Sequence, residues 1–168
     1  MSKKYKFTGV ALQCDGVTLH RIQALRSFGD VKEGDFGGWI EKEENLSHEG
    51  NCWVGDNAKV FGNAKVFGDA LVFGHAQVYG HAMVYGHAQV YGSARVYGHA
   101  LVCEYAHVYD ARVCGNTRVY GDEGVCTNKV SKSPTDKLPE ELNTLPEGVE
   151  EVVFKGVKYK KVTKWERA

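Results

Sequence analysis

The chain has 168 residues, enough for one domain with appended caps. Its 21 basic and 21 acidic residues give a formal net charge of zero, so no global field attracts nucleic acid or an anionic membrane surface, and we expect no nucleic-acid partner. No apolar run approaches the ~18 residues of a membrane span, and MSKKYKF lacks an apolar signal core. We therefore expect a cytoplasmic protein without membrane insertion.

Residues 1–50 are expected to form an N-terminal hairpin and cap. Two runs of alternating hydrophobicity, 5–14 and 17–25, flank Asp15-Gly16, a pair typical of a type I′ hairpin turn. An irregular first coil of the repeat that follows is expected near Trp39-Ile40. Such a cap would protect an array end, which otherwise exposes core and unpaired strand edges.

Residues 51–126 repeat a six-residue phrase, Ala-x-Val-aromatic-Gly-x. Self-similarity at a short fixed period is the strongest fold signal in a single sequence. Ala and Val alternate with a variable residue and an aromatic, which is the pattern of a short strand, and Gly with the residue after it forms a turn. Because every unit has the same apolar side, the chain must keep turning in one sense. This predicts an all-β solenoid with Val and Ala inside.

The phrase resembles the hexapeptide repeat of left-handed parallel β-helix proteins, in which three hexads form one triangular coil. The resemblance implies about four coils between Val54 and Val125, at the ~4.8 Å spacing of a sheet. The aromatic variant of the hexad is similar to proteins of bacterial prophages and their hosts. The period slips once, because Val108 and Val113 are five residues apart instead of six. A kink or the end of ideal coiling is expected there.

Beyond the repeats, residues 127–148 contain three prolines among Ser, Thr and Asn, and we expect a linker. Residues 149–168 are predicted to form a C-terminal β-hairpin that turns at Lys155-Gly156. This segment is rich in lysine. Its charge either balances nearby glutamates or contacts a phosphate or a partner, and the sequence leaves both open.

Four histidines occupy the station after the corner glycine: His75, His81, His87 and His99. Successive members lie on different corners of a three-sided coil, so they cannot converge on one ion. The same station holds Asn, Asp and Ser, and we interpret these residues as adopting the left-handed conformation of a corner. The five cysteines lack Cys-x-x-Cys spacing and read as free thiols in a reducing compartment. No metal site and no cofactor are expected.

His107 differs, since it occupies the outward variable station, with Glu104 and Asp110 nearby. Acyltransferases of the resembled fold usually work as trimers and place a His at the subunit boundary as a general base. That resemblance makes His107 the first candidate for a catalytic base and His99 the second. No His lies on an inserted loop, which disfavours catalysis.

The aromatic stations form three ladders when residues eighteen apart stack. The least polar ladder has Lys65 as its single expected charge, and we predict that it is the interface of a homo-oligomer, with a trimer favoured. Its residues are Phe67, Met83, Tyr85, Leu101 and Cys103. The secondary aromatic faces contain Tyr79 and Tyr97, and Tyr91 and Tyr109.

Three functions remain open. The first, which we favour from the sequence, is a non-catalytic oligomeric binding or scaffold protein of prophage type. It would grip an unknown protein partner or sequester a small molecule, and could interfere with a host or defence component. The alternative is a trimeric hexapeptide-repeat acyltransferase with an acyl-CoA-type donor. A further alternative is a structural piece of a virion tail.

Overall fold

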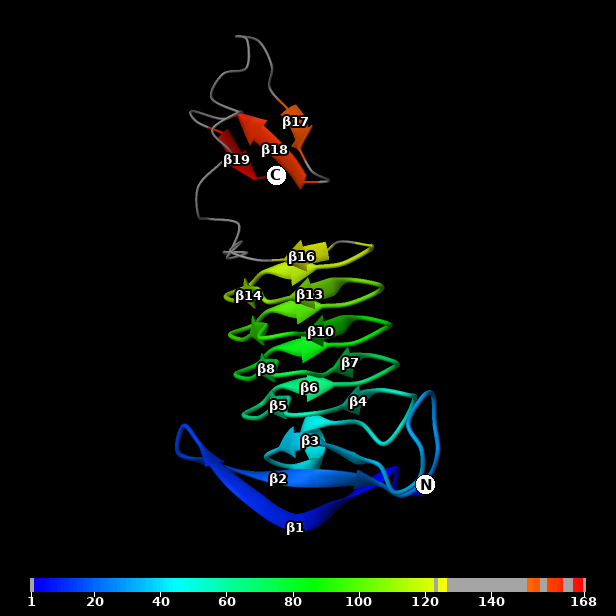
Figure 1. Cartoon of the computed structure of the whole chain (residues 1–168). Coiled ribbons are helices and arrows are strands. Elements are labelled where there is room, and N and C mark those ends of the chain that lie inside the picture. Colours follow the sequence, from blue (N-terminus) through cyan, green and yellow to red (C-terminus); the bar gives the residue numbers. More distant parts are fainter. Residues whose placement is uncertain (1, 123, 127–150, 155–156, 162–164, 168) are drawn as a thin grey trace. The chain divides into compact units, whose positions relative to one another are not determined.

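The computed structural model describes residues 2–122, 124–126, 151–154, 157–161 and 165–167. The chain divides into two compact units, residues 1–131 and residues 132–168. In the first unit a β cap is followed by a stack of coils (Figure 1). The cap contains β1 (Tyr5–Cys14), β2 (Val17–Ala24), β3 (Phe36–Ile40) and the short 3₁₀ helix η1 (Glu43–Asn45).

The solenoid has three faces, each a parallel sheet in which every strand comes from one coil. The first face continues the cap through β5 (Lys59–Val60), β8 (Gln77–Val78), β11 (Arg95–Val96) and β14 (Arg112–Val113). The second face contains β6 (Lys65–Val66), β9 (Met83–Val84), β12 (Leu101–Val102) and β15 (Arg118–Val119). The third face contains β4 (Trp53–Val54), β7 (Leu71–Val72), β10 (Gln89–Tyr91), β13 (His107–Tyr109) and β16 (Gly124–Cys126).

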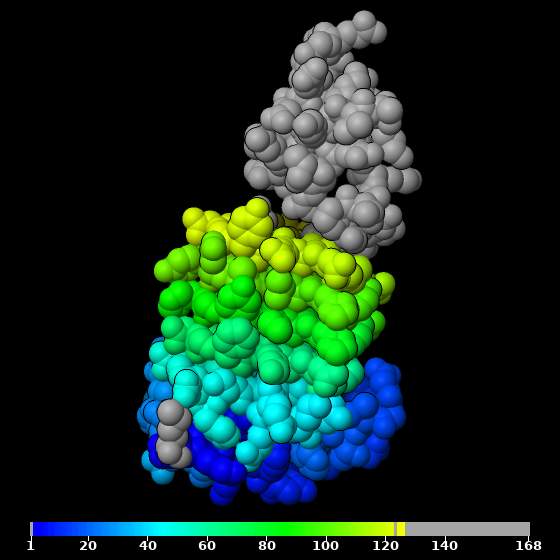
Figure 2. Space-filling view, turned by 180° about the vertical axis from the view of Figure 1, so that it is seen from behind, coloured from blue at the N-terminus to red at the C-terminus, as the bar shows by residue number. Residues whose placement is uncertain are grey.

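The strand register confirms that three hexads form one coil. Val60 pairs with Val78 and Val66 with Val84, so residues eighteen apart are neighbours in adjacent coils. The stack makes about five turns, one more than the hexads alone provide. The additional turn arises because Ile40 pairs with Val60 in parallel, which makes β3 the first strand of the solenoid. Figure 2 shows the coils as successive layers in sequence order.

The slip after Val108 shortens one corner without ending the stack. Val96 pairs with Val113, seventeen residues on, and the ladders continue through β15 and β16. Asp110 adopts a positive φ of 49° at this corner, and its Oδ1 accepts a hydrogen bond from the Ser93 N–H at 2.6 Å. The expected end of ideal coiling is therefore absent, because one acidic residue replaces the usual two-residue turn.

The core is a column of small aliphatic side chains. Every Val of the inward station from Val54 to Val113 is at most 1% exposed, and the Ala residues beside them are at most 2% exposed. Burial of each Val stabilises the fold by about 1.5–3 kcal/mol. The core therefore depends on many equal contributions, one from each hexad.

Corner geometry differs from our expectation for the histidines. The positive φ belongs to the glycine before them, for example Gly80 at 71° and Gly86 at 69°. Among the described residues, the non-Gly residues with positive φ are Asp15, Asp56, Glu104 and Asp110. A Cβ at Gly80 would lie 3.0 Å from the backbone N of Gly98 in the next coil. The interpretation of the corner histidines as left-handed residues is thus wrong. They stand one position later, with their side chains at the surface.

The cap closes the lower end of the stack with buried polar side chains. Lys4 is fully buried, and its Nζ donates to the carbonyl of Cys52 at 2.8 Å and to its Sγ at 3.2 Å. The Tyr5 hydroxyl donates to the Leu46 carbonyl at 2.7 Å. Asn45 Nδ2 donates to the Ala64 carbonyl at 2.9 Å, so it satisfies a first-coil group that lacks a strand below it.

In the second unit, β17 (Glu151–Phe154), β18 (Val157–Lys161) and β19 (Trp165–Arg167) form an antiparallel sheet. The hairpin expected over 149–168 corresponds to β17 and β18, and β19 is an additional strand that was not expected from the sequence. The expected linker, 127–148, lies outside the described residues, as does the turn at Lys155-Gly156.

Candidate functional site

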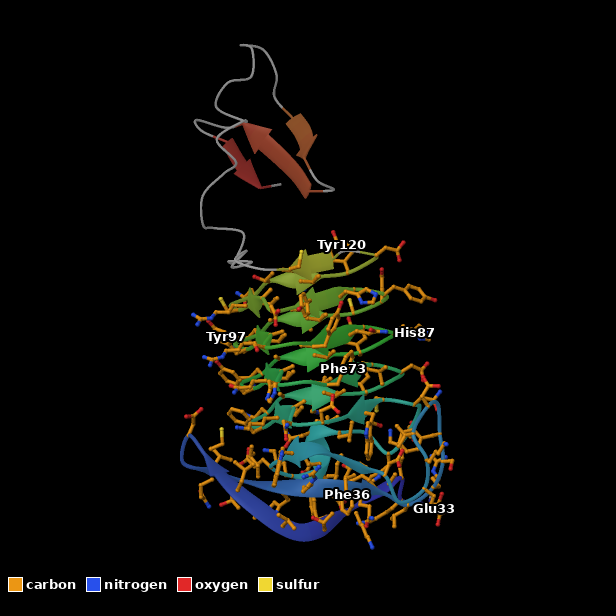
Figure 3. All side chains as sticks on the ribbon, viewed as in Figure 1. Glu33, Phe36, Phe73, His87, Tyr97 and Tyr120 are labelled. Atoms are coloured by element: carbon orange, nitrogen blue, oxygen red, sulfur yellow. The ribbon has the colours of Figure 1, made fainter. Side chains whose placement is uncertain are left out.

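One corner of the solenoid brings a histidine and a carboxylate together. The corner between the second and third faces carries Asp69 in one coil and His87 in the next. The His87 Nδ1 lies 3.8 Å from the Asp69 Oδ2. Figure 3 shows His87 at the right edge of the stack, on the opposite side from Tyr97.

Both residues of this pair have fixed backbones and accessible side chains. The Asp69 N–H donates to the Gly86 carbonyl and the His87 N–H to the Glu104 carbonyl, at 2.8 and 2.7 Å. Asp69 Oδ1 accepts the Asn51 N–H at 3.0 Å, which orients the carboxylate. The His87 and Asp69 side chains are 54% and 38% exposed, so a substrate can reach them.

An aromatic ring covers the other side of the imidazole. Tyr105 stacks on His87 with ring centroids 5.0 Å apart and planes 7° apart. The separation of 3.8 Å between His87 and Asp69 exceeds a hydrogen bond, but catalytic contacts without substrate are often long. A carboxylate beside Nδ1 favours the tautomer with the proton there. Nε2 is then free to accept a proton.

The eighteen-residue spacing predicts this pair, although we applied that spacing only to histidines and aromatic residues. We rejected the corner histidines because His75, His81 and His87 lie on different corners. The eighteen-residue spacing, applied to every residue type, stacks Asp69 under His87 and His87 under Tyr105. The corner thus combines a carboxylate from one coil with a histidine from the next, and neither coil contains the pair by itself.

The two predicted catalytic residues lie elsewhere. His107 is half-buried on the third face and packs edge-on against Tyr91, with ring centroids 6.3 Å apart. The two acidic residues expected near His107 bond to the backbone of corners instead. Glu104 accepts the Gly121 N–H at 2.7 Å, and Asp110 accepts the Ser93 N–H. In the part of the chain that the structure describes, no ion pair includes His107.

His99 is exposed and stacks on His81 at the corner between the first and second faces, with centroids 4.9 Å apart. Their eighteen-residue spacing accounts for this stacking. Neither has a carboxylate within ion-pair distance among the described residues. Within those residues no three His, Cys, Asp or Glu side chains are grouped to hold a metal ion.

The ladder that we predicted as an interface does occupy one face. Its members lie on or beside β6, β9 and β12 of the second face, and Phe67 stacks on Tyr85 with centroids 4.9 Å apart. A hydrogen bond to Cys103 raises the pKa of Tyr85. The face carries a second charge that was not expected from the sequence, because the shortened corner brings Arg118 of β15 beside Leu101.

The secondary aromatic columns also form as expected. Tyr79 stacks between Phe61 and Tyr97 on the first face, with 5.0 Å between successive centroids. Tyr91 and Tyr109 lie on the third face, with ring centroids also 5.0 Å apart.

Across the described residues, no helix has the length and apolar character needed to cross a membrane.

The fold and its repeats define the class: the chain is a hexapeptide-repeat β-solenoid, and its repeats and fold fit the left-handed β-helix superfamily. A family model described as the YdcK β-solenoid repeat matches residues 76–92 and 88–104. A curated relative from Escherichia coli K12, called an uncharacterized acetyltransferase YdcK, is 50% identical over 46 residues. That alignment covers 27% of this chain and 14% of the relative, so the chain spans a small part of the relative's length.

This similarity corrects our favoured function. From the sequence we preferred a non-catalytic scaffold of prophage type, on the ground that no histidine stands on an inserted loop. The relative is named as an acetyltransferase, which favours the alternative, an acyltransferase. The absence of a loop was a poor guide because a corner of stacked coils can present a histidine beside a carboxylate without any insertion.

Proposed function

We propose that the protein is an acyltransferase that uses His87 as its general base and Asp69 to orient that base. The observation that carries the proposal is the accessible corner pair, with His87 Nδ1 3.8 Å from Asp69 Oδ2. The name of the E. coli relative supports acyl transfer as the reaction. His87 replaces His107 and His99 as the candidate base because it alone of the three has a carboxylate partner in the described residues.

The reaction would proceed by direct transfer from an acyl-CoA-type thioester. His87 Nε2 accepts the proton of an acceptor hydroxyl or amine while that oxygen or nitrogen attacks the thioester carbonyl carbon. The new C–O or C–N bond forms, the C–S bond breaks, and the proton passes to the leaving thiolate. Asp69 stabilises the imidazolium that exists between these proton transfers.

The position of the pair suits a site between subunits. The corner of Asp69 and His87 borders the second face, where Met83 is 38% exposed and Leu101, Tyr85 and Cys103 are half-buried. Interface cores are enriched in aromatic residues and Met. We propose that this face packs against a second copy in a closed trimer. His87 would then lie at the rim of the seam.

The test is turnover of acetyl-CoA, followed as free thiol, with a panel of amine and hydroxyl acceptors. With an accepted substrate, His87→Ala should lower kcat/KM by a factor of roughly 10²–10⁴, the usual contribution of a general base. Asp69→Asn should lower it less, and mainly through kcat, because the Asn side chain still accepts the Asn51 N–H.

His75→Ala is the matched control, since His75 is an exposed corner histidine without a carboxylate partner in the described residues. It should leave kcat/KM unchanged. Equal losses in His75→Ala and His87→Ala would exclude the assignment. Loss in His107→Ala alone would return the role to His107. The seam is tested separately, because Met83→Glu with Leu101→Glu should give folded monomers in light scattering.

A further inference from the structure

A hollow lies between the cap loop and the third face of the lower coils. It has a volume of about 340 Å³ and is open to solvent on one side. Its walls come from the loop before β3, from the first residue of β3, and from β4 and β7 with the residues after them. Figure 3 labels Phe36 and Phe73, one from the cap and one from the solenoid.

The apolar part of the hollow is aromatic and aliphatic. Phe36 is 58% exposed, Phe73 is half-buried, and Trp53 and Leu71 are the other large apolar side chains in the wall. Trp53 is held in place because Phe28 packs against it edge-on, with ring centroids 5.3 Å apart. Rigid aromatic walls of this kind are typical of small-molecule sites.

The polar part of the hollow carries one sign of charge. Three carboxylates line it, those of Asp30, Asp35 and Asp56, and among the described residues no Lys, Arg or His does. Asp56 accepts the Gly74 N–H at 3.0 Å and Asp35 accepts the Lys32 N–H at 2.9 Å, so both are oriented by backbone. The chain as a whole is neutral, so this concentration of negative charge is local.

A cation is already held against aromatic rings beside this hollow. The Arg21 guanidinium lies 5.5 Å from the centre of the Phe36 ring and 5.6 Å from that of Trp39. Cations are attracted to ring faces at such distances. The surface therefore combines the two features that recognise organic cations, which are aromatic faces and carboxylates.

We infer that the hollow binds a small organic ammonium ion, with the apolar body against Phe36, Phe73 and Leu71 and the ammonium group toward Asp30 and Asp35. The apolar walls disfavour a bare metal ion, which prefers a shell of oxygen ligands. The acidic rim disfavours anions. None of the residues that line the hollow belongs to the corner of Asp69 and His87, so this inference stands independently of acyl transfer.

The test is a titration of the purified protein with 2-phenylethylammonium at pH 7, followed by backbone amide NMR shifts and calorimetry. We expect saturable binding, with shifts confined to lining residues such as Gly55, Leu71 and Phe73. The neutral analogue 2-phenylethanol should bind about tenfold or more weakly, since it lacks the charge. Higher ionic strength should weaken binding of the ammonium ion alone.

Variants separate the two parts of the site. Asp30→Asn with Asp35→Asn should reduce the affinity for the ammonium ion to that for the alcohol, while Phe36→Ala should weaken both ligands. The matched controls are Asp15→Asn and Phe7→Ala, which remove a carboxylate and an exposed ring from the cap hairpin and should change neither affinity. Phe7 is 36% exposed.

Three results would overturn the inference. Equal affinity for the alcohol and the ammonium ion would reduce the hollow to an apolar patch. Displacement of the probe by millimolar Ca²⁺ would reassign the carboxylates to a metal ion. Absence of saturable binding of 2-phenylethylammonium would exclude an organic cation. Acetyl-CoA is absent from all of these measurements, so failure here leaves the His87 assignment untouched.

Discussion

The cap and the repeats achieve a closed core by opposite means. From Val54 to Val113 the solenoid interior contains aliphatic side chains, and each coil supplies the partner for the one below. The cap has no coil beneath it, so Lys4, Tyr5 and Asn45 enter the interior and take the free carbonyl groups. A repeat can thus rely on its neighbour for hydrogen bonds, whereas an end must supply side chains for them.

The largest expected effect is in the repeats. Val84→Asp places an unpaired carboxylate at a position that is 0% exposed, which should cost at least about 5 kcal/mol, comparable with the stability of a typical domain, about 5–15 kcal/mol, and so leave little folded protein. Met83→Asp, one residue earlier and 38% exposed, is the control. Circular dichroism should show β structure for the control alone; a folded Val84→Asp protein would contradict an inward Val84.

In the cap, Lys4→Ala should lower the free energy of unfolding by about 1–3 kcal/mol, since the carbonyl of Cys52 loses a buried donor. Lys4→Met should cost less, because it keeps a long apolar side chain next to Phe28, whose ring centre lies 5.0 Å from the Lys4 Nζ. Lys3→Ala is the control and should change little, as the Lys3 side chain is 60% exposed. Urea unfolding measures all three. Equal midpoints for Lys3→Ala and Lys4→Ala would contradict the role of Lys4.

A corner substitution tests the backbone of the repeats. Gly80→Ala should cost about 1–2 kcal/mol, because φ is 71° and an added Cβ approaches Gly98. Gly80→Asn should cost less, since Asn tolerates positive φ, as Asp56, Glu104 and Asp110 do at this station. Gly124→Ala is the control, because an added Cβ meets nothing within 4 Å there. Thermal unfolding should rank the three variants in this order.

The smallest effect is a change in how the free energy of unfolding depends on pH through the buried groups of the cap. Burial raises the pKa of the Cys52 thiol above its ordinary value of 9.0. The unfolded chain therefore loses this proton first, and the stability from Cys52 is present below pH 9 and declines as pH rises through the folded pKa. Tyr5 acts in the same direction, since burial raises its pKa too, whereas burial lowers the pKa of Lys4 and opposes this trend.

Cys52→Ala isolates the thiol, and Ala is the usual residue at that station. The free energy of unfolding should fall less between pH 8 and pH 10 in this variant than in the parent, as measured by urea unfolding at each pH. An identical alkaline decline in the two proteins would mean that burial does not raise the pKa of Cys52. Tyr5 would then be the cause of the decline in stability.

The architecture could be predicted because it is local and repeated. Alternation of Ala and Val, with glycine every sixth residue, determined the all-β solenoid and its core, and the resemblance to left-handed β-helix proteins implied its three faces. A first coil was expected near Trp39-Ile40, but its register was harder to predict, since Ile40 pairs with Val60 at a spacing of twenty residues instead of eighteen. Burial of Lys4 was not predictable, because lysine is almost never buried without partners, and its partners come from residues 49–52.

The candidate site shows most clearly what the sequence determines and what the tertiary structure decides. The sequence by itself determined that a histidine follows many corner glycines, and the resemblance to left-handed β-helix proteins implied that residues eighteen apart stack. Only the tertiary structure decided which of these histidines meets a carboxylate, because Asp69 and His87 come from different coils and each looks like an ordinary corner residue in its own. It likewise decided the aromatic hollow, since Asp30 and Phe36 reach Phe73 only after the cap folds back onto the third face.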